Sequence, residues 1–239
     1  MPEATSKGQI LVTGASRGIG AAIARDLVGR GYEVAGLSRS GQAAVGYGLA
    51  CDVGDAASIK AAVEAAAARG PIVGLVNCAG AHATAPALKL EIEDFESMMH
   101  INASSVLMVS QAAHPHLVSS GGGTVVNIGS FFDKLGVPEN TAYCASKAAV
   151  GAITRCLSVE WAADAISVVN VAPGYIETDL NRDFLGRDKV RAWLQKRIPV
   201  GRPGEVSEVA RLVGSLFVER ITFLTGETIY IDGAQGMNH

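Results

Sequence analysis

The sequence predicts an α/β fold, a doubly wound parallel sheet with helices on both faces, in a single domain over residues 1–239. Short apolar runs alternate with longer alanine-rich segments from one end of the chain to the other. The runs are apolar at nearly every position, which is typical of strands in a parallel sheet covered on both faces. A chain of 239 residues, 49% hydrophobic and 18% charged, can bury the core that such a sheet needs.

The alternation predicts seven strands and five helices. We expect strands at residues 9–13, 33–38, 48–53, 72–77, 124–128, 167–171 and 228–231. We expect helices near residues 18–30, 55–69, 92–118, 139–163 and 204–219. Uninterrupted strand–helix alternation of this kind indicates a Rossmann-type sheet.

Residues 175–203 break this alternation between the sixth and seventh strands. The stretch from Arg182 to Arg202 holds seven basic and two acidic residues. A solvated helical excursion is one interpretation, and a lid over a ligand cleft is the other. Open α/β sheets bind ligands at the carboxyl ends of their strands, where this segment begins. We therefore expect a substrate lid at about 175–203.

Charge and composition argue against several classes of function. The net charge of −3 gives no reason to expect nucleic-acid or membrane partners. Charges such as Arg155 and Glu160 interrupt the longest apolar stretches, and the polar N-terminus lacks the apolar core of a signal peptide. We expect a cytoplasmic protein. The four cysteines form no C-x-x-C pair, and His114 and His116 have no carboxylate or cysteine beside them in the sequence, so no metal site is predicted.

A glycine-rich loop joins the first strand to the first helix. Gly14, Gly18 and Gly20 leave bare backbone N–H groups at the start of a helix, where the helix dipole favours an anion such as a pyrophosphate. The loop therefore predicts dinucleotide binding. Its expected contacts are Gly14, Ser16, Arg17, Gly18, Ile19 and Gly20.

The end of the second strand indicates which dinucleotide binds. A carboxylate at this place would bind the adenosine ribose and repel a 2′-phosphate. The chain has Ser38 and Arg39 here, and Arg17 projects from the glycine loop. Two guanidinium groups and a hydroxyl suit a phosphate dianion. We expect NADP(H) to be favoured over NAD(H).

Five motifs occur in order along the chain. They are the glycine loop from Thr13, Asn77-Cys78-Ala79-Gly80, Ser130, Tyr143 with Lys147, and Pro173-Gly174 followed by Thr178. With these motifs at this spacing, including thirteen residues from Ser130 to Tyr143, the chain resembles the short-chain dehydrogenase/reductase family. The ending TGETIYIDG is also similar to that family, so the resemblance covers almost the whole chain.

The resemblance implies a catalytic tetrad of Asn102, Ser130, Tyr143 and Lys147. Tyr143 would be the general acid in reduction and the base in oxidation, and Ser130 would hold the substrate oxygen. Lys147 would bind the nicotinamide ribose and lower the pKa of the tyrosine. Asn102 would interrupt its helix and hold a water that links Lys147 to solvent. An ammonium at ~4 Å from a phenolate is worth ~4 kcal/mol at an effective dielectric of ~20, so a lowered tyrosine pKa is physically reasonable.

The resemblance also implies further cofactor contacts. Asp52 and Val53 would meet the adenine, although Asp52 is equally suited to capping the next turn. Asn77 would lie near the ribose, although it could instead tie the fourth and fifth strands together. The remaining expected contacts are Ala79, Gly80, Tyr143, Lys147, Pro173, Gly174, Ile176 and Thr178.

The substrate pocket implied by the resemblance is largely aromatic. Its expected lining is Phe131, Phe132, Tyr175, Leu180, Phe184 and Trp193, with His82 near the mouth. The resulting hypothesis is an oxidoreductase that transfers a hydride between NADP(H) and an apolar or aromatic ketone, a 3-oxoacyl-type compound or the matching secondary alcohol. Asp164 stands just before the sixth strand, where reductases of acyl-carrier-protein substrates usually have a basic residue, and it counts against a carrier-protein partner.

Two alternatives remain open at this stage. One is an NAD-dependent sugar-acid or polyol dehydrogenase, because APGYIETDLN looks much like the same stretch in those enzymes. The other is a non-catalytic dinucleotide-binding regulator, which is disfavoured because all four tetrad positions are filled. The resemblance further implies a homotetramer built on the helices after the fourth and fifth strands.

Overall fold

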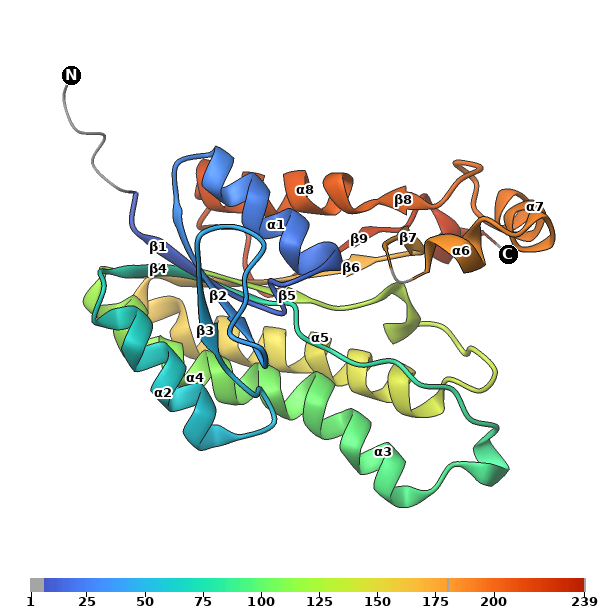
Figure 1. Ribbon diagram of the computed structural model, residues 1–239, viewed down its shortest axis with the longest axis horizontal. Coiled ribbons are helices and arrows are strands. Elements are labelled where there is room, and N and C mark those ends of the chain that lie inside the picture. Colours follow the sequence, from blue (N-terminus) through green and yellow to red (C-terminus); the bar gives the residue numbers. More distant parts are fainter. Residues whose placement is uncertain (1–6, 180, 239) are drawn as a thin grey trace.

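A parallel seven-stranded sheet forms the centre of the protein, in the strand order β3-β2-β1-β4-β5-β6-β9 (Figure 1). The computed structural model describes residues 7–179 and 181–238, and the side chain of residue 184 lies outside this description. The strands are β1 (Gln9–Thr13), β2 (Glu33–Ser38), β3 (Tyr47–Ala50), β4 (Ile72–Asn77), β5 (Gly123–Ile128), β6 (Ile166–Pro173) and β9 (Thr228–Ile231). The predicted single-domain α/β fold is confirmed.

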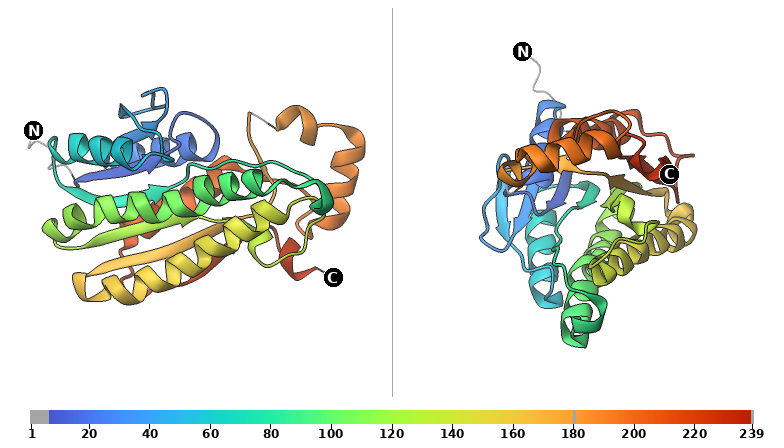
Figure 2. Two further views of the ribbon diagram at one scale, coloured as in Figure 1. Left: turned by 90° about the horizontal axis from the view of Figure 1, so that it is seen from below. Right: turned by 90° about the vertical axis from the view of Figure 1, so that its right-hand side faces the viewer.

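Helices cover both faces of this sheet, as the views in Figure 1 and Figure 2 show. One face carries α1 (Gly18–Gly29) and α8 (Val206–Glu219), which pack closely against each other. The other face carries α2 (Ala56–Ala67), α4 (Ser105–Ser119) and α5 (Thr141–Trp161). Each face has its own apolar core, around Ile10 and Val34 on the α1 side and around Leu11 and Leu75 on the α2 side. Because neighbouring residues of one strand point to opposite faces, a strand buried on both faces must be apolar throughout.

The helix expected over residues 92–118 is divided into three parts. They are α3 (Ile92–Met99), a π-helical turn η2 (His100–Ser104) and α4. A π-turn inserts one extra residue per turn and is often found at functional sites. Asn102 lies in this turn, so the helix is interrupted at Asn102 as expected.

The link between β2 and β3 is only eight residues long and contains no helix, although the two strands are parallel. Such connections usually need a dozen or more residues. Here the loop lies directly on the sheet, and a Cβ on Gly36 would come within 2.5 Å of the Cβ of Ala43. The third strand ends at Ala50, earlier than the predicted residue 53, because Asp52 and Asp55 form the turn and the N-cap that open α2.

The segment at 175–203 forms a small unit of its own beyond β6. A short pair of strands, β7 (Ile176–Glu177) and β8 (Gly204–Glu205), closes its base. Between them lie α6 (Arg182–Leu185) and α7 (Asp188–Arg197), which stand at the right-hand end of Figure 1. Leu185, Leu194 and Ile198 form its small core. The 3-10 turns of the protein are η1 (Ala87–Lys89), η3 (Phe131–Asp133), η4 (Ala162–Asp164) and η5 (Gln235–Met237).

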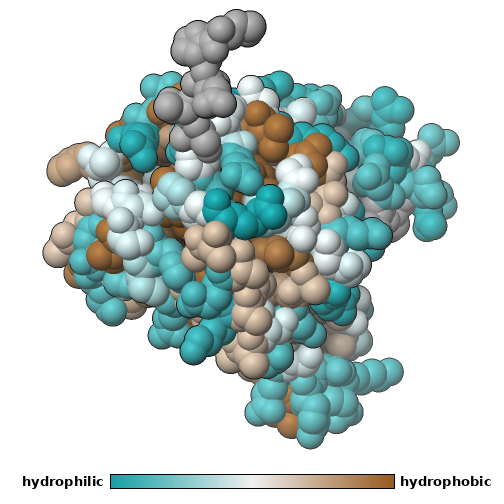
Figure 3. Space-filling model, turned by 60° about the vertical axis from the view of Figure 1, so that its left-hand side comes forward, coloured by the Kyte–Doolittle hydropathy of each residue, from teal (hydrophilic) through white to brown (hydrophobic). Residues whose placement is uncertain are grey.

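The surface mixes hydrophilic and hydrophobic residues. On the face seen in Figure 3, hydrophobic side chains lie in small patches between hydrophilic ones. Within the described residues, no helix combines the length and the apolar character that crossing a membrane requires.

Candidate active site

The four tetrad positions come from three elements that meet at the carboxyl end of β5. Ser130 follows β5 directly, and Tyr143 and Lys147 lie one turn apart in α5. The ammonium nitrogen Nζ of Lys147 is 5.8 Å from the centre of the Tyr143 ring and donates a hydrogen bond to the carbonyl of Ile128 at 2.9 Å. Ser130 and Lys147 are both buried. The structure therefore brings the predicted serine, tyrosine and lysine together.

Asn102 joins this group by gripping the loop that follows β4. Its Nδ2 donates to the carbonyl of Ala81 at 2.9 Å, and its Oδ1 accepts from the N–H of the same residue at 2.8 Å. The Nδ2 group also lies 3.1 Å from the hydroxyl of Ser146 in α5. The extra residue of the π-turn aims this amide at the loop, so Asn102 ties the turn to both α5 and the strand-four loop. Its expected role of holding a water stays a prediction.

Burial dominates the electrostatics of the tyrosine and the lysine. Burial raises the pKa of the Tyr143 phenol above its ordinary value of 10.0, and the interaction with the Ser130 hydroxyl lowers this pKa by less. Burial also lowers the pKa of Lys147 to about 8. The expected lowering of the tyrosine pKa by Lys147 is therefore wrong for this structure, because the ammonium lies beside the ring, bonded to Ile128, and the cost of burying a phenolate is larger.

The glycine loop has the shape of an anion cradle. Gly14 and Gly18 have φ of +70° and +56°, a backbone conformation that side chains disfavour. The first turn of α1 has no side-chain cap, so its N–H groups remain for a ligand. The hydroxyl of Thr13 accepts hydrogen bonds from the N–H groups of Cys78 and Ala79, at 2.9 and 3.0 Å, and so joins this loop to the one after β4. A dinucleotide pyrophosphate fits this arrangement.

Residues at the carboxyl end of β2 lie where the adenosine end of the dinucleotide is expected. Arg17 and Arg39 are exposed, so both guanidinium groups are accessible. Ser38 is buried, and its hydroxyl donates to the carbonyl of Gln42 at 2.7 Å. Its exposed neighbour Ser40 lies 3.3 Å away, oxygen to oxygen. The hydroxyl of Ser40 also accepts from the N–H of Gln42 at 3.3 Å, so both serines belong to the turn that follows β2.

Two of the expected cofactor contacts already have protein partners. The side chain of Asn77 is buried and donates to Asn127 on β5 and to Ser110 on α4, both at 2.9 Å. Asp52 accepts from the N–H of Gly54 at 2.9 Å. These are the strand tie and the turn cap that the sequence left open as alternatives, and the contacts of both residues with a cofactor stay predictions, as does that of Val53.

The loop after β6 approaches the glycine loop from the far side. A Cβ placed on Gly18 would lie 3.9 Å from the methyl carbon of Thr178. Gly174, the residue after Pro173, packs closely against Asp232. A Cβ placed on Gly174 would lie 2.7 Å from the Cα of Asp232. Ile176 is buried in β7. A cofactor lying across Gly18 would therefore pass close to Thr178.

Aromatic rings continue from the tyrosine into the 175–203 segment. The ring centres of Tyr143 and Phe132 are 6.0 Å apart, those of Phe132 and Tyr175 6.2 Å, and those of Tyr175 and Trp193 5.8 Å. Phe131 packs beside them, 5.5 Å from Tyr175. Of the other predicted pocket residues, Leu180 and the side chain of Phe184 lie outside the described part of the structure. The rings form one wall from Tyr143 to α7.

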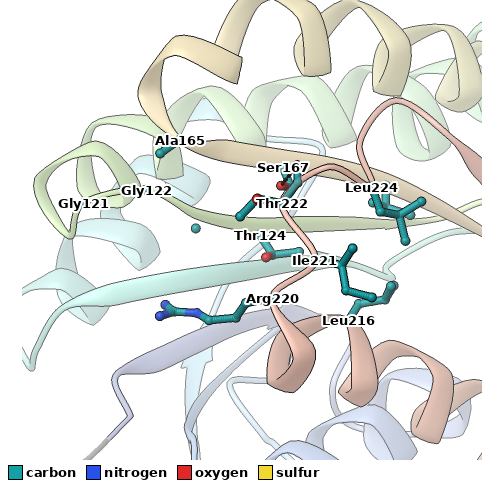
Figure 4. Close-up of a pocket in the computed structure, with 12 residues that line it drawn as sticks. Gly121, Gly122, Thr124, Ala165, Ser167, Leu216, Arg220, Ile221, Thr222 and Leu224 are labelled. Carbon is teal, nitrogen blue, oxygen red and sulfur yellow. Dashed lines mark hydrogen bonds between the residues drawn. The ribbon is translucent and has the colours of Figure 1, made fainter.

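A separate cavity of about 190 Å³ lies at the amino ends of β5 and β6 (Figure 4). It is lined by residues that precede or open β5 and β6, among them Gly122, Thr124 and Ala165, and by Arg220 after α8. Ser130 follows the carboxyl end of β5, so this cavity lies at the other end of that strand, away from the tetrad residues. Among residues 7–179 and 181–238, no cluster of histidine, cysteine, aspartate and glutamate could hold a metal ion.

Comparison with known proteins agrees with this geometry. A family model described as enoyl-(acyl carrier protein) reductase matches residues 14–238. The chain belongs to the short-chain dehydrogenase/reductase family.

Three similar members of this family illustrate its range. The chain is 35% identical to D-threitol dehydrogenase of Mycolicibacterium smegmatis over 236 residues, covering 93% of this chain and 90% of the relative. It is also 35% identical to the 3-oxoacyl-(acyl-carrier-protein) reductase FabG of Escherichia coli, over 95% and 96% of the two chains. A crystal structure of gluconate 5-dehydrogenase from Burkholderia cenocepacia, in complex with NADP and tartrate, matches with a TM-score of 0.91 at 32% identity, over 98% and 97% of the chains.

The short-chain dehydrogenase/reductase described here is thus an NAD(P)-dependent oxidoreductase. The alternative of a non-catalytic regulator falls away. The relatives act on different compounds by their names, so the comparison leaves the substrate to be argued from this chain's own residues.

Proposed function

We propose that the protein transfers a hydride between NADP(H) and a ketone or secondary alcohol with apolar or aromatic substituents. The observation that supports this most is the ring wall from Tyr143 through Phe132 and Tyr175 to Trp193. A carbonyl oxygen held at the Tyr143 hydroxyl would leave its substituents against these rings, where apolar surface is removed from water. The 175–203 segment would then be a lid that supplies part of the wall.

Each tetrad side chain has a role in this proposal. The bound dinucleotide supplies or accepts the hydride. Tyr143 gives a proton to the carbonyl oxygen in reduction, and its raised pKa keeps the phenol protonated at neutral pH. Ser130 orients the same oxygen, and Lys147 binds the cofactor ribose. Asn102 keeps the loop at Ala81 in place beside them.

The preference for NADP(H) rests on Arg17 and Arg39. Both are exposed beside the carboxyl ends of β1 and β2, and a 2′-phosphate would bind them through charge-assisted hydrogen bonds. Titration of the purified protein with NADPH and NADH tests this. We expect NADPH to bind more tightly than NADH. Arg39→Ala should weaken the binding of NADPH by about tenfold or more and leave the affinity for NADH unchanged. Arg25→Ala, an exposed arginine in α1, is the matched control. Equal or tighter binding of NADH by the wild type would overturn the preference.

A sugar-acid or polyol dehydrogenase that uses NAD is the second candidate. The similarity to D-threitol dehydrogenase and to gluconate 5-dehydrogenase favours a polyol or sugar-acid substrate, whereas the latter structure holds NADP rather than NAD. Turnover of a panel of aryl ketones, 3-oxoacyl thioesters, polyols and sugar acids with both cofactors separates the two candidates. If the substrate is a 3-oxoacyl compound, we expect a small thioester rather than one carried by an acyl-carrier protein. The reason is that the acidic Asp164 stands before β6, where it accepts a hydrogen bond from His114 at 2.9 Å.

We also propose a homotetramer that uses the outer face of α4 and α5. A groove of about 570 Å³ runs between these helices, lined by apolar residues that include Leu107, Ile153 and Trp161. Val159 is 80% exposed on the same helix α5. Sedimentation of the wild type and of Val159→Glu checks this, and a monomeric wild type would contradict it.

A further inference from the structure

His82 is a polar side chain in direct contact with the reacting tyrosine. It lies in the loop after β4, two residues beyond Gly80, and is exposed. Its ring meets that of Tyr143 edge to face, with centres 4.7 Å apart and planes at 87°. No other imidazole among the described residues contacts the tetrad tyrosine. The ring therefore borders the place where a substrate oxygen would bind.

The hydrogen bonds of Asn140 indicate which nitrogen of the neutral His82 ring carries the hydrogen. The Nδ2 of Asn140 donates to the carbonyl of Pro138 at 2.8 Å, and a carbonyl can only accept. The other amide atom, Oδ1, must then be the one that lies 2.8 Å from the Nε2 of His82. Since Oδ1 is an acceptor, Nε2 carries the hydrogen. In the neutral ring Nδ1 is consequently an unprotonated acceptor.

The backbone on both sides of His82 is held as well. Asn102 binds both the N–H and the carbonyl of Ala81, the preceding residue. The N–H of Ala85 donates to the carbonyl of Glu139 at 2.9 Å, which joins the same loop to the start of α5. The ring of His82 is therefore held against the ring of Tyr143 by backbone contacts on both sides of it.

The Nδ1 atom has no hydrogen-bond partner within residues 7–179 and 181–238. An acceptor that is left open on a ring in contact with the Tyr143 ring suits a substrate that brings its own donor. We propose that His82 is a specificity-determining residue that accepts a hydrogen bond from a hydroxyl on the carbon next to the reacting carbon. The preferred substrates are then α-hydroxy ketones and the matching vicinal diols. This rests on the proposed oxidoreductase function and narrows its substrate class.

One substrate can contact both the ring wall and His82. Tyr143 contacts both His82 and Phe132, so a carbonyl bound there has an acceptor and an apolar surface within reach. An aryl α-hydroxy ketone would use both, with its hydroxyl at Nδ1 and its ring against Phe132. A polyol would use the acceptor alone.

Two matched ketones test the proposal. The hydroxyl of 2-hydroxyacetophenone can donate a hydrogen bond, whereas the ether oxygen of 2-methoxyacetophenone cannot. We expect the NADPH-dependent kcat/KM of the wild type to favour the hydroxy ketone, and the ratio of the two values to fall about tenfold when the acceptor is lost. A ratio measured on one preparation does not depend on the fraction of active enzyme.

Three substitutions divide the functions of the imidazole. His82→Gln places an amide near the position of Nε2 and keeps a partner for Asn140, but removes the acceptor at Nδ1. His82→Asn places its amide near the position of Nδ1 and retains an acceptor there. His82→Phe keeps the ring contact with Tyr143 and has no nitrogen. We expect the ratio to fall in the Gln and Phe variants and to stay within about threefold of the wild type in the Asn variant.

The outcomes separate this proposal from the proposed function. If the wild type reduces both ketones without preference, or if the Gln and Phe variants keep the wild-type ratio, the role of His82 is overturned and the oxidoreductase function stands. If the wild type binds NADPH but turns over no member of the ketone and polyol panel, the proposed function fails, and the role of His82 fails with it. NADPH titration of each variant verifies that its cofactor site is folded.

Discussion

The ammonium of Lys147 donates a hydrogen bond to the main-chain carbonyl of Ile128, 2.9 Å away, from a position that is only 7% exposed. Burying this charge lowers the pKa of Lys147 from 10.5 to about 8. A group whose pKa is lower in the folded protein than in the unfolded chain destabilises the fold wherever both states are protonated. The buried ammonium of Lys147 therefore lowers the stability of the fold.

Replacing Lys147 by methionine is expected to stabilise the protein and abolish its activity. Each pKa unit corresponds to ~1.4 kcal/mol, so removing the buried charge contributes about 3 kcal/mol at pH 7, less about 1 kcal/mol for the lost hydrogen bond. The destabilisation is fully present below pH 8 and disappears as the pH rises towards 10.5, so the advantage of Lys147→Met should shrink over that range. Urea unfolding at pH 7 and pH 10 measures it, with Lys60→Met on the exposed face of α2 as control. A variant less stable than the wild type at pH 7 would contradict this account.

The pH dependence of reduction should reflect the same lysine. The pKa of Tyr143 is raised above 10.0, so the phenol remains protonated through neutral pH and does not limit reduction there. Lys147 loses its proton near pH 8, and with it the charge that, in the proposed function, binds the cofactor ribose. We expect kcat/KM for NADPH-dependent reduction to fall as the pH rises through about 8. A rate that stays level up to pH 9.5 would show that the charge of Lys147 is not needed.

Tyr143→Phe should remove proton transfer and leave the fold intact. The phenylalanine ring keeps the contacts with His82 and Phe132, while the proton donor is lost. General acid catalysis contributes about 10²- to 10⁴-fold, so kcat should fall by that factor with NADPH affinity unchanged. The control is Tyr32→Phe. The hydroxyl of Tyr32 donates to the carbonyl of Phe217 on α8, away from the tetrad. Residual activity within about tenfold of the wild type would mean that another group delivers the proton.

The sequence predicted most of the sheet because parallel strands buried on both faces have a simple signature. β1, β2, β4 and β9 begin and end at the predicted residues. The positions of Asn102, Ser130, Tyr143 and Lys147 came from the resemblance to the family, and the structure brings these side chains together at the end of β5. Their catalytic roles stay predictions. The direction of the tyrosine pKa shift was not predictable, since it depends on how deeply the phenol is buried, which spacing along the chain does not reveal. The tautomer of His82 depends on its contact with Asn140 from another loop, and such contacts have no sequence period.

A buried row of amides across the sheet should be important for stability. Asn77, Asn127 and Asn170 occupy one rung of β4, β5 and β6. Asn127 accepts from Asn77 and donates to Thr154, both at 2.9 Å. Asn127→Leu removes both bonds and leaves one of the two buried N–H groups of the Asn77 amide without a partner, at a cost of about 2–4 kcal/mol in the free energy of unfolding. Urea unfolding checks this against Asn238→Leu, which changes an exposed asparagine in the same way. Equal effects of the two substitutions would show that the row contributes nothing of its own.

Gly20→Ala should damage the cofactor loop for a purely steric reason. A Cβ at this position would lie 2.3 Å from the carbonyl oxygen and 2.8 Å from the carbonyl carbon of Gly14, so the turn between β1 and α1 would have to open. We expect binding of NADPH and NADH to weaken together by about tenfold or more, because the pyrophosphate cradle is common to both. Gly29→Ala in the same helix is the control, since nothing lies within 4 Å of its Cβ. There alanine should stabilise the protein by about 0.5–1 kcal/mol through helix propensity. If Gly20→Ala weakened the binding of NADPH but not that of NADH, its effect would have to come from the 2′-phosphate end of the site. The pyrophosphate would then bind elsewhere than at the glycine loop.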